Sequence, residues 1–112
     1  MVKLEIIVRG ERVADVVAAL ERCGYPGLTM YTVEGRGTQK GLTEQFRGRT
    51  YEIPFLFKTK IEVVIRDEDC EKVVEAVSTA ARTGAIGDGK IFISPIMDVV
   101  RIRTGERQEQ AI

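Results

Sequence analysis

Hydrophobic residues occur in the same order in the two halves of the chain. In the first half, residues 3–9 (KLEIIVR) alternate apolar with charged side chains, which is typical of a half-buried strand. From Glu11 the apolar residues recur at helical spacing until Gly24, and a second strand-like run, LTMYTV at residues 28–33, follows. The helical apolar positions are Val13, Val16, Val17, Leu20 and Cys23.

The second half repeats this order. Residues 60–66 (KIEVVIR) predict a strand, Asp67 is a plausible helix N-cap, and residues 90–94 (KIFIS) predict a last strand. Between them runs a helical stripe that ends near Arg82. Two consecutive strand–helix–strand units predict an α+β fold of the ferredoxin-like βαββαβ type, with one antiparallel sheet and both helices on one face. The stripe consists of Cys70, Val73, Val74, Val77 and Ala81.

A single layer of helices leaves the other face of the sheet uncovered. Alternation along the strands places Ile7, Glu62 and Val64 on this open face. Because large exposed apolar patches seldom persist on monomers, we expect the chain to assemble through the sheet. The opposite, core-facing set is Ile6, Ile61, Val63 and Ile65.

Length and composition exclude several classes of function. The 112 residues fit one domain, 1–112, and Lys plus Arg equals Asp plus Glu at 17 each, so no bulk charge attracts nucleic acid. The absence of histidine excludes His-based catalysis and argues against zinc. We expect Cys23 and Cys70 to be small buried or half-buried residues. No apolar run reaches about 18 residues, and MVKLEIIVRGER does not resemble a signal peptide, so we expect a cytoplasmic protein without membrane insertion.

The segment joining the halves is unusually long. Residues 35–55, GRGTQKGLTEQFRGRTYEIPF, show neither helical nor strand periodicity. Connections in compact domains are usually about 4–6 residues, and those beyond about 12–15 are commonly functional or disordered. We interpret this segment as functional.

A second unusual stretch, ARTGAIGDGKIFIS at residues 81–94, contains Gly84, Gly87 and Gly89 followed by Lys90. Glycines let backbone amides approach an anion closely, and a lysine beside them supplies charge. The alternative is a helix C-cap followed by an ordinary turn.

The segment VVRIRTGE, residues 99–106, offers further charge for an anion. Arg101 and Arg103 alternate around Ile102, so in a strand both guanidinium groups would project from one face and could grip a polyphosphate. The alternative is a solvated edge strand whose charges discourage aggregation.

Four motifs together resemble one family. GRGTQKG, FRGRTY, TGAIGDGKIF and RIRTGE stand at the positions, spacing and order seen in PII signal-transduction proteins, nitrogen regulators of the GlnB and GlnK type, and the similarity spans the chain. The resemblance implies a homotrimer that is not an enzyme. It implies binding of ATP or ADP between subunits, and of 2-oxoglutarate beside Mg-ATP. It also implies control of a partner, an ammonium channel or other transporter or a metabolic or regulatory enzyme, through the T-loop at about residues 36–55. A transporter partner would recruit the protein to the inner membrane.

The resemblance also assigns residues to these ligands. Gly87, Asp88, Gly89 and Lys90 would wrap the phosphates, and Arg101 and Arg103 would reach them from the adjoining subunit. The full nucleotide set is Ile7, Thr29, Gly35, Gly37, Thr38, Gln39, Glu62, Val64, Gly87, Asp88, Gly89, Lys90, Arg101 and Arg103. The 2-oxoglutarate set is Gln39, Lys40, Gly41 and Lys58, with Gln39 also coordinating magnesium through its side-chain oxygen.

Within the T-loop, Arg47 matches the arginine that enters the channel mouth in relatives. Tyr51 matches a tyrosine that is nucleotidylylated in many bacterial members, and an unmodified exposed tyrosine is the alternative. Thr38 stands where an arginine usually contacts the terminal phosphate, which weakens the expectation of ATP-over-ADP discrimination. The other departures from the family pattern are Leu42 for His, Phe46 for Tyr, Pro54 for Asp and Ala85 for Lys.

One other function remains open from the sequence, and a further one is discounted. One is a divergent PII-like sensor of adenine nucleotides for another pathway, such as metal or bicarbonate transport, that does not use 2-oxoglutarate. The other is slow ATP hydrolysis, which we discount because the sequence offers no dedicated base.

Overall fold

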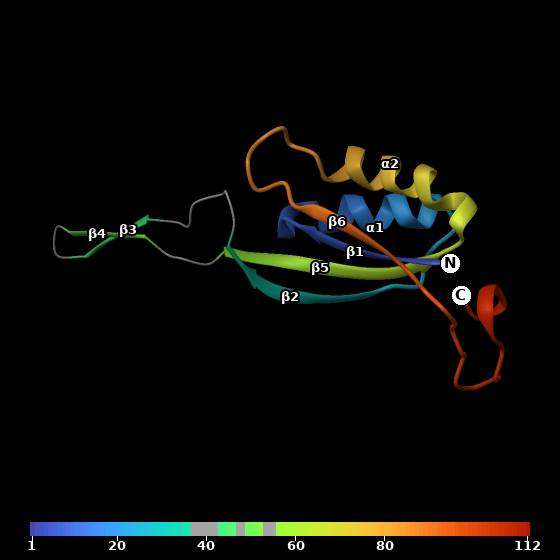
Figure 1. Ribbon diagram of the computed structural model, residues 1–112. Coiled ribbons are helices and arrows are strands. Elements are labelled where there is room, and N and C mark those ends of the chain that lie inside the picture. The colour runs from blue at the N-terminus through green and yellow to red at the C-terminus, as the bar shows by residue number, and fades with distance from the viewer. Residues whose placement is uncertain (37–42, 47–48, 53–55) are drawn as a thin grey trace.

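The computed structural model describes the backbone of residues 1–36, 43–46, 49–52 and 56–112, and the side chains of residues 1–36 and 56–112. The main sheet has four antiparallel strands in the order β2-β5-β1-β6 (Figure 1). This order places the first strand of each half at the centre, as the ferredoxin-like prediction requires. The strands are β1 (Val2–Val8), β2 (Thr29–Gly35), β5 (Leu56–Ile65) and β6 (Lys90–Pro95).

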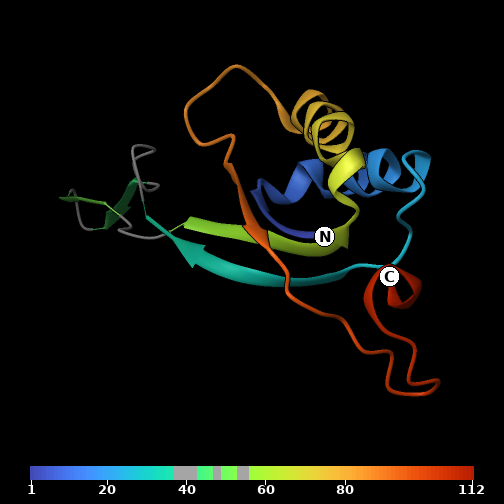
Figure 2. The ribbon, with the colours of Figure 1, turned by 45° about the vertical axis from the view of Figure 1, so that its right-hand side comes forward.

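Two helices cover one face of this sheet, α1 (Val13–Arg22) and α2 (Cys70–Ala81) (Figures 1 and 2). Short 3-10 turns precede them, η1 (Gly10–Arg12) and η2 (Asp67–Asp69). Gly24, with φ +92°, ends α1 as predicted. The predicted N-cap at Asp67 is wrong, because Asp67 opens η2 and its carboxylate pairs with the amino terminus at 2.9 Å. No helix in the described part of the chain has the length and apolar character needed to cross a bilayer.

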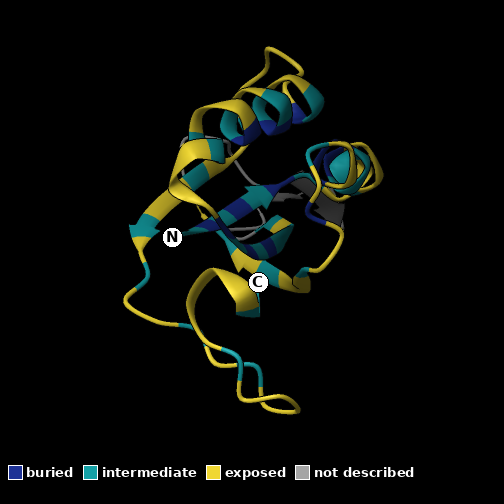
Figure 3. Cartoon of the chain, turned by 90° about the vertical axis from the view of Figure 1, so that its right-hand side faces the viewer, coloured by how far each residue is buried: buried dark blue, intermediate teal, exposed yellow. Residues whose placement is uncertain are grey.

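The core lies between the helices and the sheet, as the dark blue positions in Figure 3 show. Ile6 pairs with Ile61 across β1 and β5, and both are fully buried. Burying one such side chain contributes about 1.5–3 kcal/mol relative to leaving it exposed. The predicted alternation and both helical stripes are therefore confirmed. The fully buried large side chains are Leu4, Ile6, Leu20, Ile61, Ile65, Val16, Val73 and Val77.

The open face carries more charge than its predicted apolar positions suggested. Ile7 and Val64 lie on it as expected, but between them Lys60 pairs with Glu5 at 3.0 Å and lies 3.9 Å from Glu62. Apolar surface concentrates instead at the edge strands, where Phe92 and Tyr31 are 50% and 42% exposed. The open face therefore combines a central ion-pair network with flanking aromatic rings.

The hairpin inside residues 35–55 was not predicted. Strands β3 (Thr43–Phe46) and β4 (Arg49–Glu52) pair antiparallel, with Glu44 opposite Tyr51. Strands of four residues are too short to show a clear period, so pattern analysis missed them.

The C-terminal segment leaves the sheet after β6 and ends in a short 3-10 helix, η3 (Gln108–Ala111), shown in red in Figure 2. The predicted strand through Arg101 and Arg103 is wrong. A turn replaces it, closed by the bond from the Gly105 N–H to the Arg101 carbonyl at 2.8 Å. Gly105 adopts φ +74°, which only glycine takes readily, so the Thr-Gly pair favours a turn over a strand.

Candidate functional site

The glycine-rich connection between α2 and β6 forms a wide loop. Gly84, Gly87 and Gly89 have φ values of +88°, +101° and +105°. The helix ends at Ala81 with an extended residue, Arg82, as its C-cap, so none of the glycines caps the helix. The glycine C-cap alternative therefore does not apply. We call residues 83–89 the glycine loop.

Gly89 fixes the end of this loop against the sheet. A Cβ at this position would lie 1.7 Å from the carbonyl oxygen of Ile7, far inside any real contact distance. The next residue, Lys90, pairs with Ile7 at the end of the β1–β6 ladder. The loop thus starts β6 directly beside Ile7, which brings together two parts of the predicted nucleotide set.

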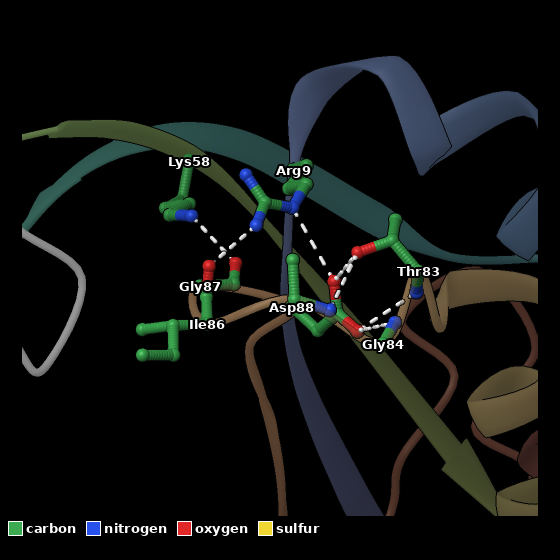
Figure 4. Close-up of polar contacts among 8 residues, drawn as sticks. Arg9, Lys58, Thr83, Gly84, Ile86, Gly87 and Asp88 are labelled. Carbon is green, nitrogen blue, oxygen red and sulfur yellow. Dashed lines mark hydrogen bonds and ion pairs between the residues drawn. The ribbon is translucent and has the colours of Figure 1, made fainter.

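The carboxylate of Asp88 organises the loop from inside (Figure 4). It accepts hydrogen bonds from the Thr83 hydroxyl, from the Thr83 N–H at 2.7 Å and from the Gly84 N–H at 2.9 Å. Arg9 donates a fourth bond through Nε at 3.3 Å. These bonds, led by that of the Thr83 hydroxyl, hold the pKa of Asp88 far below its usual value. The side chain is committed to the loop, so Asp88 can offer an anion only its backbone N–H.

Two cations hold the carbonyl groups at the tip of the loop. Arg9 donates to the Ile86 carbonyl at 2.6 Å, and Lys58 Nζ donates to the Gly87 carbonyl at 2.7 Å (Figure 4). Partial burial, followed by the nearby charge of Arg9, lowers the pKa of Lys58. The residue predicted for 2-oxoglutarate therefore lies against the loop predicted for the phosphates.

Arg9 was not among the predicted site residues. It ends the first strand pattern, where an arginine normally marks only a solvated terminus, and its partner Asp88 lies 79 residues away along the chain. No local spacing connects them. The contact becomes evident only in the structure, where Gly89 packs against the backbone of β1.

A second group of predicted residues lies further along the sheet. Thr29 pairs with Glu62, and Val64 follows two residues later on β5. Beside them is an open cavity of about 580 Å³, which the C-terminal segment helps to enclose. Its lining includes Thr29, Glu62, Val64, Val99, Ala111 and Ile112.

The two arginines lie in the C-terminal turn, between Val99 and Ala111 of the cavity lining along the chain. Arg101 pairs with Glu106 at 2.8 Å, and Thr104 bonds the same carboxylate oxygen at 2.8 Å. Arg103 is exposed in the turn. The two guanidinium groups are thus placed by a turn and an ion pair rather than by strand alternation.

The predicted nucleotide residues that the structure describes therefore fall into two groups, one around the glycine loop and one along β5 and the C-terminal turn. Ile7 lies opposite Lys60, whereas Val64 lies opposite Lys3, about 13 Å further along β5 at the rise of a strand. We call Ile7, Arg9, Lys58 and residues 83–90 the loop end. We call Thr29, Glu62, Val64, Arg101 and Arg103 the arginine end.

The structure places only part of the remaining predicted site residues. Gly35 ends β2 opposite Leu56, close to the loop end. Tyr51 and Phe46 belong to the β3–β4 hairpin, but their side chains are outside the described part. The magnesium ligand, the target contact and the fate of Tyr51 therefore stay predictions. The predicted or divergent residues outside the described backbone are Gly37, Thr38, Gln39, Lys40, Gly41, Leu42, Arg47 and Pro54.

Comparisons with known proteins all match this chain to one family. A family model described as "Nitrogen regulatory protein P-II" matches residues 1–106. "Nitrogen regulatory protein P-II 2" of Methanothermobacter thermautotrophicus is 52% identical over 112 residues, covering 100% of this chain and 97% of the relative. "Nitrogen regulatory protein P-II" of Synechocystis sp. is 50% identical, and that of Microchaete diplosiphon is 49% identical, each over the full length of both chains.

Proposed function

Because the chain belongs to the nitrogen regulatory protein P-II family, we propose that it is a homotrimeric signalling protein that binds ATP or ADP between neighbouring subunits. Nucleotide and 2-oxoglutarate then set the conformation of residues 36–55, which act on a target protein. The observation that carries this proposal is the division of the nucleotide residues between the loop end and the arginine end.

A ring of identical subunits unites the two ends. In a head-to-tail interface, one surface of a subunit meets a different surface of the next, and rotation closes the ring. The loop end of one subunit then faces the arginine end of its neighbour. Each cleft then receives both halves of the site, whereas within one chain Val64 lies about 13 Å along the sheet from the level of Ile7.

The chemistry of the two ends suits a nucleoside polyphosphate. At the loop end, the amides beside Gly87 and the ammonium of Lys90 offer donors to phosphate oxygens. At the arginine end, Arg103 offers a planar fork that binds two phosphate oxygens at once. Thr29 and Glu62 supply polar groups for the nucleoside, while Val64 offers an apolar surface to the base.

The position of Lys58 supports a role for 2-oxoglutarate. Its ammonium contacts the Gly87 carbonyl, so a carboxylate arriving beside the phosphates could take over that donor. Magnesium would supply a cation shared by the γ-phosphate, the oxo acid and the side-chain oxygen of Gln39, a suitable hard ligand. ADP lacks the γ-phosphate, so 2-oxoglutarate should require ATP.

Target control follows from where the ligands bind. A ligand changes an equilibrium between loop conformations only if it contacts them differently. Gln39 belongs both to the ligand set and to residues 36–55, so it can make that difference. The target we propose is a transporter such as an ammonium channel, which would recruit the trimer to the inner membrane, or a metabolic enzyme.

Calorimetry tests this function directly. ATP and ADP should each bind, and 2-oxoglutarate should bind with Mg-ATP but far more weakly with ADP. Lys58→Ala should abolish the response to 2-oxoglutarate and spare ATP binding, whereas Lys72→Ala, on the exposed side of α2, should change neither. Failure of the wild-type protein to bind either nucleotide would overturn the proposal.

One observation favours a second candidate. By the resemblance, residue 38, which is Thr here, stands where an arginine is usual in the family. Nucleotide binding without any 2-oxoglutarate binding would therefore indicate a sensor of adenine nucleotides for another pathway, such as metal or bicarbonate transport. The same titration separates the two candidates.

A further inference from the structure

The tip of the glycine loop has a defined orientation. The carbonyl groups of Ile86 and Gly87 both point at cations, Arg9 and Lys58 (Figure 4). In a trans peptide the N–H points opposite to the C=O of the same unit. The N–H groups of Gly87 and Asp88 therefore face away from Arg9 and Lys58. Within the described residues, neither of these N–H groups donates a hydrogen bond.

Nothing in the glycines themselves fixes this orientation. Gly84 and Gly87 have no side chain to restrict φ, so a glycine peptide can rotate between conformations of similar energy. A reversed peptide would present a carbonyl oxygen, not an N–H, to an incoming phosphate. A loop that binds phosphate through its amides needs an anchor outside its glycines.

The anchor visible in the structure is the Asp88 carboxylate. Thr83 and Gly84, at the start of the loop, donate three bonds to it, and Arg9 donates a fourth from the end of β1. Arg9 also holds the Ile86 carbonyl, so one guanidinium group links the anchor to the tip. Three of these four donors act from within the same short loop.

We propose that Thr83, Asp88 and Arg9 are positioning residues that lock the glycine loop with the N–H groups of Gly87 and Asp88 presented to phosphate. This inference rests on the proposed nucleotide function and adds to it a group of side chains that act without touching the ligand. The Asp88 carboxylate then serves an anion site although its own charge is negative, because its charge is neutralised inside the loop.

Thr83→Val provides the sharpest test, since valine keeps the shape of threonine and removes only the hydroxyl. The affinity for ATP should fall about tenfold, the loss expected for one charge-assisted hydrogen bond. The affinity for adenosine, which has no phosphate, should stay unchanged. The amide NMR signals of Gly87 and Gly89 should shift in the ligand-free protein.

Three further variants complete the design. Thr83→Ser, which restores a hydroxyl, should return ATP affinity and the amide signals to wild-type values. Thr79→Val, at an exposed position of α2, should match the wild type. Asp88→Asn weakens the anchor by a different change and should lower ATP affinity at least as much as Thr83→Val, while Asp15→Asn, at an exposed pair on α1, should not.

The possible results distinguish a failure of the positioning role from a failure of the proposed function. If the wild type binds ATP and both Thr83→Val and Asp88→Asn bind it equally well, the proposed function stands and the positioning role is overturned. Equal losses for ATP and adenosine would also overturn it, because they would indicate general damage. A wild type that binds no ATP would overturn the proposed function, and the positioning role with it.

Discussion

The loop end and the arginine end differ in how much of their chemistry is complete within one chain. At the loop end, the charged groups of Arg9, Lys58 and Asp88 all have partners, and Gly89 packs on the backbone of β1. At the arginine end, a turn presents Arg103 to solvent, and Thr29, Glu62 and Val64 line an open cavity of about 580 Å³. The loop end is preorganised within one chain, whereas Arg103 at the arginine end is exposed to solvent.

This difference has a physical consequence for binding. A preorganised group loses little conformational entropy when the ligand arrives, whereas an exposed arginine must be immobilised at that moment. The loop end should therefore decide where the phosphates lie. The arginine end should add affinity once a neighbouring subunit is present.

The largest expected effect lies at the contact between Gly89 and β1. Gly89→Ala should destabilise the fold by at least about 3 kcal/mol, because its Cβ would overlap the Ile7 carbonyl. Gly84→Ala is the matched control, since its φ is also positive but no atom lies within 4 Å of the added Cβ. It should cost about 1–2 kcal/mol. Equal costs in denaturant unfolding would show that the loop is not fixed against β1.

At the arginine end, Arg103→Ala should leave the fold intact and weaken nucleotide binding. Loss of a charge-assisted contact to phosphate corresponds to about a ten- to hundredfold fall in affinity for ATP and ADP. Arg22→Ala, at an exposed position near the end of α1, is the control and should have no effect. Calorimetry showing unchanged binding for Arg103→Ala would remove this arginine from the site.

The smallest expected effect concerns the ion pairs between the two ends. The hydrogen bond from Lys60, as the main cause, lowers the pKa of Glu5. A lowered carboxyl pKa contributes stability above the ordinary value, and this contribution is lost as the pH falls through the folded value. The melting temperature should therefore fall less steeply for Glu5→Gln than for the wild type between about pH 6 and about pH 3. Glu21→Gln on α1 should follow the wild-type curve, and identical curves for all three would contradict the interpretation.

The sequence predicted what depends on short-range periodicity. Val16 and Leu20 on α1, like Val73 and Val77 on α2, are fully buried, as their spacing requires. The alternation also predicted correctly that Ile6 faces the core and that Ile7 lies on the open face of the sheet. These features follow from 3.6-residue and two-residue repeats that each segment carries within itself.

Features that depend on residues far apart in the sequence were either not predicted or predicted wrongly. The contacts of Arg9 with Asp88 and Ile86 join segments nearly eighty residues apart and leave no local pattern. The alternation of Arg101 and Arg103 suggested a strand, but a strand needs a neighbouring edge, and here the chain turns back on itself instead. An alternation that spans only three residues carries too little information to decide between a strand and a turn.

Mixed trimers test most directly whether each site is shared between two subunits. Lys90→Ala damages the loop end and Arg103→Ala the arginine end, so each variant alone should bind ATP weakly at every cleft. After the two variants are refolded together in equal amounts, about one cleft in four should pair two intact ends in a head-to-tail ring and regain wild-type affinity. If the mixture binds ATP no better than the separate variants, the site does not combine the two ends from neighbouring subunits.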